Sequence, residues 1–325
     1  MSRLRARTLL TLLFAVAPVV PTGCSRLGPI GPGLDSALWR DAPHLVAGDE
    51  GGPGPLRVAA VGVSVDRGEN SFNAVLYRPA DLAGQLPAIV FLPGYLAPED
   101  QYEGYARALA SRGFLVAVHG RFSPFVSDGE MTAAARTIAD WLIAEQGADA
   151  NRIGVAGHSM GGKAAVLAAA EDPRFRAIVS IDPDDRGDPP VDAALRDLEA
   201  PLLLIGAEVS WKAASFCADR NHNYERFFEK APVGTVELTL LGADHVQVMD
   251  DPEAFGLSLC RCGTADSRAV RTIARRATVH FFLEHLAGRP ASPFDLGGIG
   301  RLRVRTLTEG AVPPRTSVVA DRASA

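Results

Sequence analysis

The chain has 325 residues, of which 47% are hydrophobic, and a formal net charge of -5 at pH 7. This length suits one large domain with appendages or two small domains, and the apolar fraction is sufficient for a sizeable core. The mild negative charge, without any basic run interleaved with aromatic residues, excludes the usual pattern of a nucleic-acid-binding surface, so we expect no nucleic-acid partner.

The first 23 residues have the pattern of an export signal. Arginines alternate over positions 3–7 and precede the apolar run 8–20, which at about 13 residues is too short for a bilayer span of roughly 20. Gly23 directly before Cys24 resembles a bacterial lipobox, although Pro21 stands where leucine or valine is usual. We therefore predict a cell-envelope lipoprotein, diacylated at Cys24 and attached to the membrane only through that lipid. Ordinary secretion and an uncleaved anchor are the alternatives.

The remaining chain divides into a tether, a folded domain and a tail. Residues 24–54 are rich in glycine and proline without periodicity, which predicts a tether before a domain at 55–290. Strand-like apolar runs follow at 56–65, 73–78, 88–92, 114–119, 153–156, 177–181, 202–205 and 236–240. Helical patterns separate most of these runs, at 99–112, 130–145, 163–170, 223–230 and 267–287. Residues 291–325 lack apolar periodicity and are expected to form a loosely attached tail.

The alternation of strands and helices predicts the fold. A mostly parallel, eight-stranded sheet flanked by helices follows from it, and the closeness of the first two strands predicts an antiparallel hairpin. Continuous apolar runs such as 202–205 are typical of strands buried on both faces. The predicted class is therefore α/β, with the arrangement of the α/β-hydrolase fold.

The segment Gly157–Gly161, which reads GHSMG, is the most informative motif. It follows the strand-like run 153–156 and opens the helical run 163–170. A strand, a GxSxG motif and a helix in this order are typical of the nucleophile elbow of α/β-hydrolases, in which the flanking glycines relieve crowding in a tight turn. The motif therefore predicts that Ser159 is a nucleophile with an exposed hydroxyl.

A serine nucleophile requires a histidine base, and the base requires a carboxylate to orient it. In this fold the chain order is serine, acid, histidine. His245 lies in a loop after the last predicted strand, where the fold places its base, and it fits better than His222, which starts a short helix. Asp182, at the end of the strand 177–181, is the preferred acid, and Glu208, after the next strand, is the alternative.

Stabilisation of the developing oxyanion requires two backbone N–H donors. We expect one from Met160, the residue after the nucleophile, and the other from Tyr95, in the loop that follows the third strand. The Tyr95 ring is also a candidate for the wall of an acyl pocket. This chemistry implies neither an organic cofactor nor a metal.

The cysteines outside the signal segment are Cys217, Cys260 and Cys262. Export makes a disulfide possible, and Cys217 is predicted to pair with Cys260 or with Cys262, a choice that the sequence leaves open. A zinc site is a weaker interpretation, because the Cys260-x-Cys262 pair lacks a second ligand pair at zinc spacing. We therefore expect no metal site.

Residues 86–288 resemble chlorophyllases and the cutinase-like polyester hydrolases of the α/β-hydrolase superfamily. The segments that carry the resemblance are YARALASRGFLVAV at 105–118, SDGE at 127–130, GHS and GGK at 157–163, IDP at 181–183, Cys217-Ala218, Asn221-His222, Phe227-Phe228, Asp244-His245, Met249-Asp250-Asp251 and Cys260-x-Cys262.

The two families imply different acids. Chlorophyllases use the aspartate of the IDP segment, which implies Asp182 here. Polyester hydrolases place the acid in a segment similar to GAExD, and the corresponding segment 206–210 has Ser210 at the acid position. By contrast, Pro93-Gly94-Tyr95 and Met160 resemble the polyester hydrolases, so the expected acid is chlorophyllase-like and the expected oxyanion loop is cutinase-like.

The resemblance implies a serine carboxylester hydrolase that acts through an acyl-enzyme. The short segment between Asp182 and Pro201 leaves no room for a large cap domain, so an uncovered cleft is expected to accept a bulky or apolar ester, either a small molecule or a polymer. We expect a monomer. An acyltransferase with the same three side chains, or a non-catalytic binding protein on this fold, are the alternative functions.

Overall fold

The structure is a computed structural model that describes residues 52–66, 68, 71–120, 125–212, 217–253, 260–288 and 302–308. The predicted export signal, Cys24, most of the predicted tether and most of the predicted tail lie outside these residues. Within the described ranges, none of the helices combines the length and the apolar character that crossing a membrane requires.

One sheet forms the centre of the described chain. Its strands are β1 (Val58–Val65), β2 (Phe72–Pro79), β3 (Leu86–Leu92), β4 (Leu115–His119), β5 (Ala148–His158), β6 (Phe175–Ile181), β7 (Leu202–Ala207), β8 (Val236–Leu240) and β9 (Leu302–Thr306), in the spatial order β1-β2-β4-β3-β5-β6-β7-β8-β9. Every pair from β4 to β8 is parallel, whereas β1 with β2, β2 with β4 and β8 with β9 are antiparallel. The predicted mostly parallel sheet with an antiparallel first pair is confirmed.

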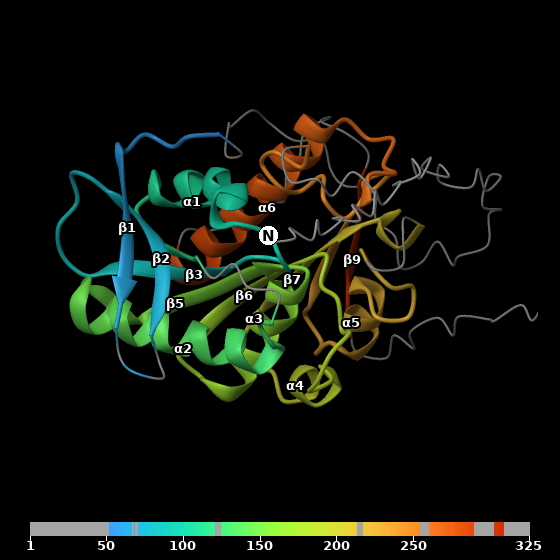
Figure 1. Cartoon of the computed structure of the whole chain (residues 1–325), viewed down its shortest axis with the longest axis horizontal. Helices are drawn as coiled ribbons and strands as arrows, with labels where there is room; N and C mark the ends of the chain where they lie inside the picture. The colour runs from blue at the N-terminus through green and yellow to red at the C-terminus, as the bar shows by residue number, and fades with distance from the viewer. Residues whose placement is uncertain are drawn as a thin grey trace, which may run out of the picture.

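Helices cover both faces of the sheet (Figure 1). One face carries the short 3₁₀ segment η3 (Glu99–Tyr102), α1 (Glu103–Ala110) and α6 (Ser267–Ala287), and the other carries α2 (Asp128–Glu145), α3 (Met160–Glu171), α4 (Asp192–Arg196) and α5 (Tyr224–Lys230). The central strands β4 and β7 are buried along their whole length. An apolar core therefore lies on each face, as continuous apolar strand sequences predict.

Local signals in the sequence explain where two of the long helices begin. Ser127 caps α2, because its hydroxyl accepts a hydrogen bond from the Glu130 N–H while the Glu130 carboxylate accepts one from the Ser127 N–H. Asp266 caps α6 in a similar way, and that helix ends at Gly288, whose φ of 62° is left-handed. The capping box moves the start of α2 two residues ahead of the predicted range.

The ninth strand, β9, corrects the predicted number of eight strands. It lies inside the segment 291–325, which we expected to be loosely attached, and pairs antiparallel with β8. Its sequence LRVRT alternates apolar and basic residues, which suits a half-covered edge strand. Arg305 forms an ion pair with the buried Glu237 and lies 4.3 Å from the centre of the Phe228 ring. These contacts attach the strand to the domain.

Candidate active site

Ser159 lies in the tight turn between β5 and α3. Its φ of 56° is in the left-handed region that non-glycine residues rarely adopt, and the turn directs the serine away from the helix that it caps. Side chains at the flanking positions Gly157 and Gly161 would meet backbone carbonyl groups, at Gly161 and at Leu92 respectively. The glycines therefore permit the turn in the way that the sequence predicted.

Two neighbouring segments hold an aspartate and a histidine at the same edge of the sheet. Asp182 directly follows β6 and also has a left-handed φ, of 38°. His245 lies in the turn after β8. Because β5, β6 and β8 are parallel, their carboxyl ends meet at one edge, and these residues converge on Ser159 although they are distant in sequence.

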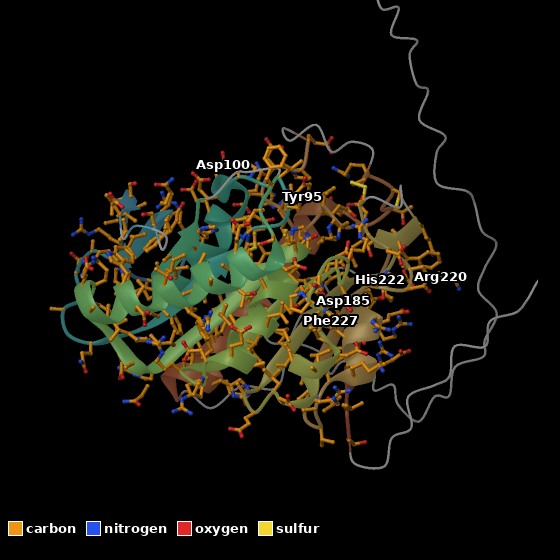
Figure 2. All side chains as sticks on the ribbon, turned by 60° about the horizontal axis from the view of Figure 1, so that its bottom comes forward. Tyr95, Asp100, Asp185, Arg220, His222 and Phe227 are labelled. Carbon is orange, nitrogen blue, oxygen red and sulfur yellow. A yellow bond between two sulfur atoms is a disulfide. The ribbon has the colours of Figure 1, made fainter. Side chains whose placement is uncertain are left out.

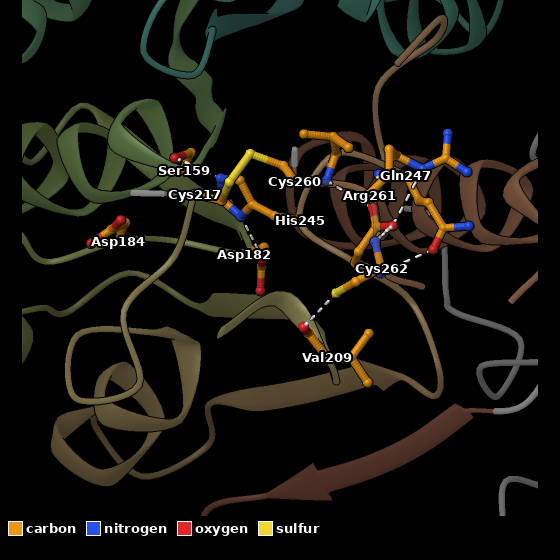
Figure 3. Close-up of a disulfide and its surroundings, with 12 residues drawn as sticks. Ser159, Asp182, Asp184, Val209, Cys217, His245, Gln247, Cys260, Arg261 and Cys262 are labelled. Atoms are coloured by element: carbon orange, nitrogen blue, oxygen red, sulfur yellow. Dashed lines mark hydrogen bonds and ion pairs between the residues drawn. A yellow bond between two sulfur atoms is a disulfide. The ribbon is translucent and has the colours of Figure 1, made fainter. Parts of the chain in front are cut away.

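The His245 ring bridges the serine and the aspartate (Figure 3). Its Nε2 atom lies 2.9 Å from Ser159 Oγ, and its Nδ1 atom lies 2.6 Å from Asp182 Oδ2. Asp182 Oδ1 accepts a further hydrogen bond, of 2.9 Å, from the Ala207 N–H. A carboxylate only accepts, so His245 carries its proton on Nδ1 and its Nε2 is available to accept the serine proton. All three side chains are buried, which corrects the expectation of an exposed Ser159 hydroxyl: Ser159 is only 8% exposed, although it lines the cleft described below.

The alternatives from the sequence lie elsewhere. The Glu208 carboxylate accepts a hydrogen bond from the Gly242 N–H at 2.8 Å, and the nearest acid to the His245 ring is Asp182. His222 pairs with Asp219 at 2.8 Å, and its carbonyl oxygen accepts from the Asp185 N–H at 2.8 Å; Figure 2 shows it next to Asp185 and Arg220. The structure thus brings Ser159, Asp182 and His245 together and leaves Glu208 and His222 out.

The two expected oxyanion donors are backbone groups close to Ser159. Met160 is the first residue of α3, so its N–H belongs to a helix N-terminus, where backbone N–H groups lack an intrahelical acceptor and favour negative charge. Tyr95 lies in a turn that the Ala97 N–H closes by donating to the Gly94 carbonyl at 3.0 Å. Tyr95 is 46% exposed and lines the same cavity as Ser159.

A cavity of about 610 Å³ opens beside Ser159 and His245. One wall is apolar and contains Val246, Met249 and the Cys217–Cys260 disulfide, on the face of the sheet that carries α1 and α6. The opposite wall contains Asp184 and Arg186, which pair with each other. The cleft is therefore amphipathic, with the reactive groups between its walls.

His245 lies in the loop that follows β8, which we call the base loop because His245 is the candidate base. A second aspartate, Asp244, holds this loop. Its carboxylate is completely buried and accepts hydrogen bonds from the N–H groups of Val246, Gln247, Cys262 and Gly263, at 2.8–3.2 Å. Several backbone donors on one carboxylate fix a turn strongly. The sequence placed Asp244 next to the base but gave no signal of this role.

A disulfide joins Cys217 to Cys260 beside the site, which settles the pairing in the structure (Figure 3). The Cys262 thiol lies outside this bond and donates to the Val209 carbonyl oxygen at 3.4 Å. The disulfide links the segment after β7 to the segment that Asp244 holds. Among the described residues, no group of histidine, cysteine and acidic side chains is placed to hold a metal ion.

A second buried polar cluster lies under the charged wall. The Lys163 ammonium, on α3, is 2.7 Å from Asp128 Oδ2 and 3.4 Å from Asp185 Oδ1, and it donates to the Gly187 carbonyl at 3.1 Å. Burial raises the pKa of Asp128, and Lys163 partly offsets this effect. Sequence reasoning missed the cluster, because a lysine after GxSxG is normally solvated.

Fold and site together define the class of the protein, which is an α/β-hydrolase with serine, histidine and aspartate in hydrogen-bonded order. Within this class the chain belongs to the PET hydrolase-like family, whose sequence profile matches residues 46–249. The chain is 26% identical over 207 residues to a bis(hydroxyethyl) terephthalate hydrolase of Streptomyces coelicolor, covering 62% of this chain and 65% of that protein.

Two further relatives represent the two families that the sequence resembles. A chlorophyllase type 0 of Chenopodium album is 23% identical over 211 residues, covering 54% of this chain and 60% of the relative. The cutinase est2 of Thermobifida alba is 24% identical over 161 residues, covering 48% of this chain and 52% of the relative. The predicted resemblance is confirmed, and the chain spans about half to two thirds of the length of these relatives.

Proposed function

We propose that this protein is a serine carboxylester hydrolase. The observation that carries the proposal is the single His245 ring within hydrogen-bond distance of both Ser159 Oγ and Asp182 Oδ2. A neutral imidazole in this position acts as a general base toward the serine hydroxyl, and the carboxylate stabilises the imidazolium that forms.

The reaction proceeds in two halves. Ser159 Oγ attacks the ester carbonyl carbon while its proton moves to His245 Nε2, and His245 then gives this proton to the departing alcohol. A water molecule, deprotonated by His245, attacks the acyl-enzyme and releases the carboxylic acid, and Ser159 recovers its proton. The N–H groups of Tyr95 and Met160 bind the oxyanion in both halves, and each such donor typically contributes about 2.7–4 kcal/mol to lowering the barrier.

The cleft supports a bulky, largely apolar ester. The segment between β6 and β7 is completely described and contains only the short helix α4, so no cap domain closes the site from there. Tyr95 is 46% exposed at the cleft, and Phe125, next to the lining residue Val126, is 88% exposed. An exposed aromatic ring that lines the cleft, with a second one on the residue next to a lining position, suits apolar substrates, including polymers.

Replacement of the nucleophile tests the proposal. Wild type and Ser159→Ala are assayed with p-nitrophenyl esters of increasing acyl length, with bis(hydroxyethyl) terephthalate and with a chlorophyll. We expect turnover of at least one ester by wild type and a loss of about 10⁴-fold or more in the variant, with unchanged circular dichroism. Equal rates in the two proteins would refute the mechanism.

The same assay separates the alternative functions. A hydrolase releases the free acid even when a competing alcohol is present, whereas an acyltransferase forms the new ester in preference. A binding protein on this fold turns over none of the esters and leaves Ser159 unmodified by a fluorophosphonate probe. Chromatography of the products and mass spectrometry of the protein therefore distinguish the three functions.

We also propose that the protein is exported and anchored to the cell envelope through a lipid on Cys24. The alternating arginines, the short apolar run and Gly23 before Cys24 support this localisation. Labelling of cells with radioactive palmitate should mark the wild-type protein and not a Cys24→Ser variant. Equal labelling of both proteins would refute the proposal that Cys24 carries a lipid.

A further inference from the structure

His158, which stands next to the nucleophile, forms two hydrogen bonds that determine its protonation. Its Nε2 atom is 3.0 Å from the backbone carbonyl oxygen of His245, and its Nδ1 atom is 2.8 Å from the Tyr102 hydroxyl. Because a carbonyl oxygen only accepts, Nε2 must carry the hydrogen. In the neutral ring, Nδ1 is then an acceptor, and Tyr102 donates to it.

The Tyr102 hydroxyl extends this chain of bonds to the oxyanion loop. It accepts a hydrogen bond from the Gly94 N–H at 3.0 Å while it donates to His158. Gly94 directly precedes Tyr95. Each group in the chain thus donates to the next. The Gly94 N–H donates to the Tyr102 hydroxyl, which donates to His158 Nδ1, and His158 Nε2 donates to the His245 carbonyl. They connect the oxyanion loop, the nucleophile turn and the base loop.

Burial keeps both linking side chains neutral. His158 is 2% exposed, and desolvation, followed by the nearby His245, holds the pKa of the His158 imidazole well below its ordinary range. Desolvation also raises the pKa of the Tyr102 phenol far above its ordinary value. The His158 and His245 ring centres are 4.7 Å apart. A neutral His158 thus avoids a second positive charge beside the imidazolium that turnover creates.

We propose that Tyr102 and His158 are positioning residues that fix the oxyanion loop and the base loop relative to Ser159. This inference rests on the proposed ester hydrolase function. Neither side chain transfers a proton or touches the reacting atoms. Their bonds set the separation between the Tyr95 N–H and the His245 ring, and small displacements of such groups have large effects on rate.

Tyr105 supplies a matched control for the central experiment. The Tyr102 and Tyr105 rings both pack against Phe91, with centroid distances of 5.0 and 5.5 Å, and both are buried. The Tyr105 hydroxyl donates to the Val248 carbonyl at 3.0 Å. Tyr102→Phe and Tyr105→Phe therefore each remove one buried hydroxyl, but only the first removes the link to His158 and Gly94.

We expect Tyr102→Phe to lower kcat by about 10- to 100-fold with KM changed by less than about threefold, because the oxyanion donor and the base lose their common support. Tyr105→Phe should change kcat by less than about twofold, and both variants should show similar melting temperatures. Equal kcat values in the two variants would overturn the proposal.

Two substitutions at His158 test the two bonds separately. Glutamine reaches the position of Nε2 and keeps the donor to the His245 carbonyl, whereas asparagine reaches the position of Nδ1 and keeps the acceptor for Tyr102. If the bonds form one chain, Tyr102→Phe in the His158→Gln background should lower kcat by less than about threefold, because the bond to Nδ1 is already lost. Fully additive losses would contradict the chain.

The tautomer of His158 gives a readout that does not depend on activity. Nitrogen-15 NMR of wild type at pH 7 should show a neutral His158 ring with the hydrogen on Nε2, and Tyr102→Phe should alter the Nδ1 signal. A hydrogen on Nδ1 would overturn the inference directly. If wild type turned over none of the esters, the proposed function and the positioning role would fall together, whereas wild-type turnover with equal variants would remove only the positioning role.

Discussion

Two buried polar clusters border the same cleft, and they are constructed differently. In the first, Ser159 and Asp182 have left-handed backbone conformations, and the histidine between them has one partner on each ring nitrogen. In the second, the ammonium of Lys163 is surrounded by carboxylates and a carbonyl group. Backbone strain and hydrogen bonds around a single carboxylate characterise the first cluster, and several charges of both signs characterise the second.

This difference indicates different roles. Backbone strain costs stability and persists where the geometry serves a function. A paired buried lysine holds the surrounding segments together, but its net contribution is small because desolvation opposes the attraction between the charges. We therefore expect changes in the first cluster to affect rate with little effect on stability, and changes in the second to affect stability with little effect on rate.

The largest effect should come from Asp182→Asn. An amide at this position stabilises the wrong tautomer of His245 and cannot balance the imidazolium, which should lower kcat by about 10³- to 10⁴-fold. Steady-state kinetics with a p-nitrophenyl ester measure this loss, and urea unfolding should show a stability within about 1 kcal/mol of wild type. A variant that retained a tenth of the wild-type kcat would remove Asp182 from the mechanism.

Lys163→Met should have the opposite effect, a large loss of stability with little change in rate. It leaves the buried Asp128 without a cation, whereas Asp185 keeps its ion pair with Arg226, and this should lower the free energy of unfolding by about 3–5 kcal/mol. The rate per folded molecule should stay within about threefold of wild type. Adding Asp128→Asn removes this unpaired charge and should restore part of the stability. A large loss of kcat in folded Lys163→Met would show that the second cluster serves the reaction.

Removal of the disulfide tests whether the apolar wall of the cleft can be weakened without displacing His245. The disulfide closes a loop with a sequence separation of 43 residues, so the double variant Cys217→Ser, Cys260→Ser should lose about 2–4 kcal/mol of unfolding free energy. Because Asp244 holds the base loop by other bonds, kcat should fall by less than about tenfold. Urea unfolding and kinetics measure both quantities, and a melting temperature equal to that of wild type would contradict the structural role.

The smallest expected effect is a pH dependence of the unfolding free energy. It tests whether His158 is neutral in the folded state, in contrast to the charged cluster around Lys163. The folded state lowers the pKa of His158, so its stabilising contribution is complete above the ordinary histidine pKa of about 6.5 and is lost as pH falls below it. Between pH 6.5 and 5.5, wild type should lose about 1 kcal/mol of unfolding free energy that His158→Gln does not lose. The same pH dependence in both proteins across this range would show that the folded state does not lower the pKa of His158.

Local patterns in the sequence predicted most of the first cluster and none of the second. Ser159 follows from a motif in a strand–turn–helix context, and His245 follows from its place after the last parallel strand. The sequence preferred Asp182 and kept Glu208 as the alternative, and the geometry decides between them, because both acids follow neighbouring strands and only Asp182 reaches the base. Tertiary contacts decide such choices, and a single sequence does not contain them.

The remaining gaps have physical causes. β9 has only five residues and two arginines in its interior, so its apolar signal is weak, and its partners, the backbone of β8 and the Glu237 carboxylate, are distant in the chain. The sequence shows His158 only as part of the motif, and its proposed role arises from contacts with Tyr102 and the His245 carbonyl, which are distant in the chain. In each case long-range partners give the residue its role.

The most direct test of the central claim is the site of covalent modification by a fluorophosphonate. Ser159 Oγ should form a bond to phosphorus and expel fluoride, with the serine proton taken by His245. Intact mass spectrometry should then show one adduct per chain, and peptide mapping should place it on Ser159, with much slower labelling of Asp182→Asn. An adduct on another residue, or an unmodified wild-type chain under conditions that label a control esterase, would contradict the account.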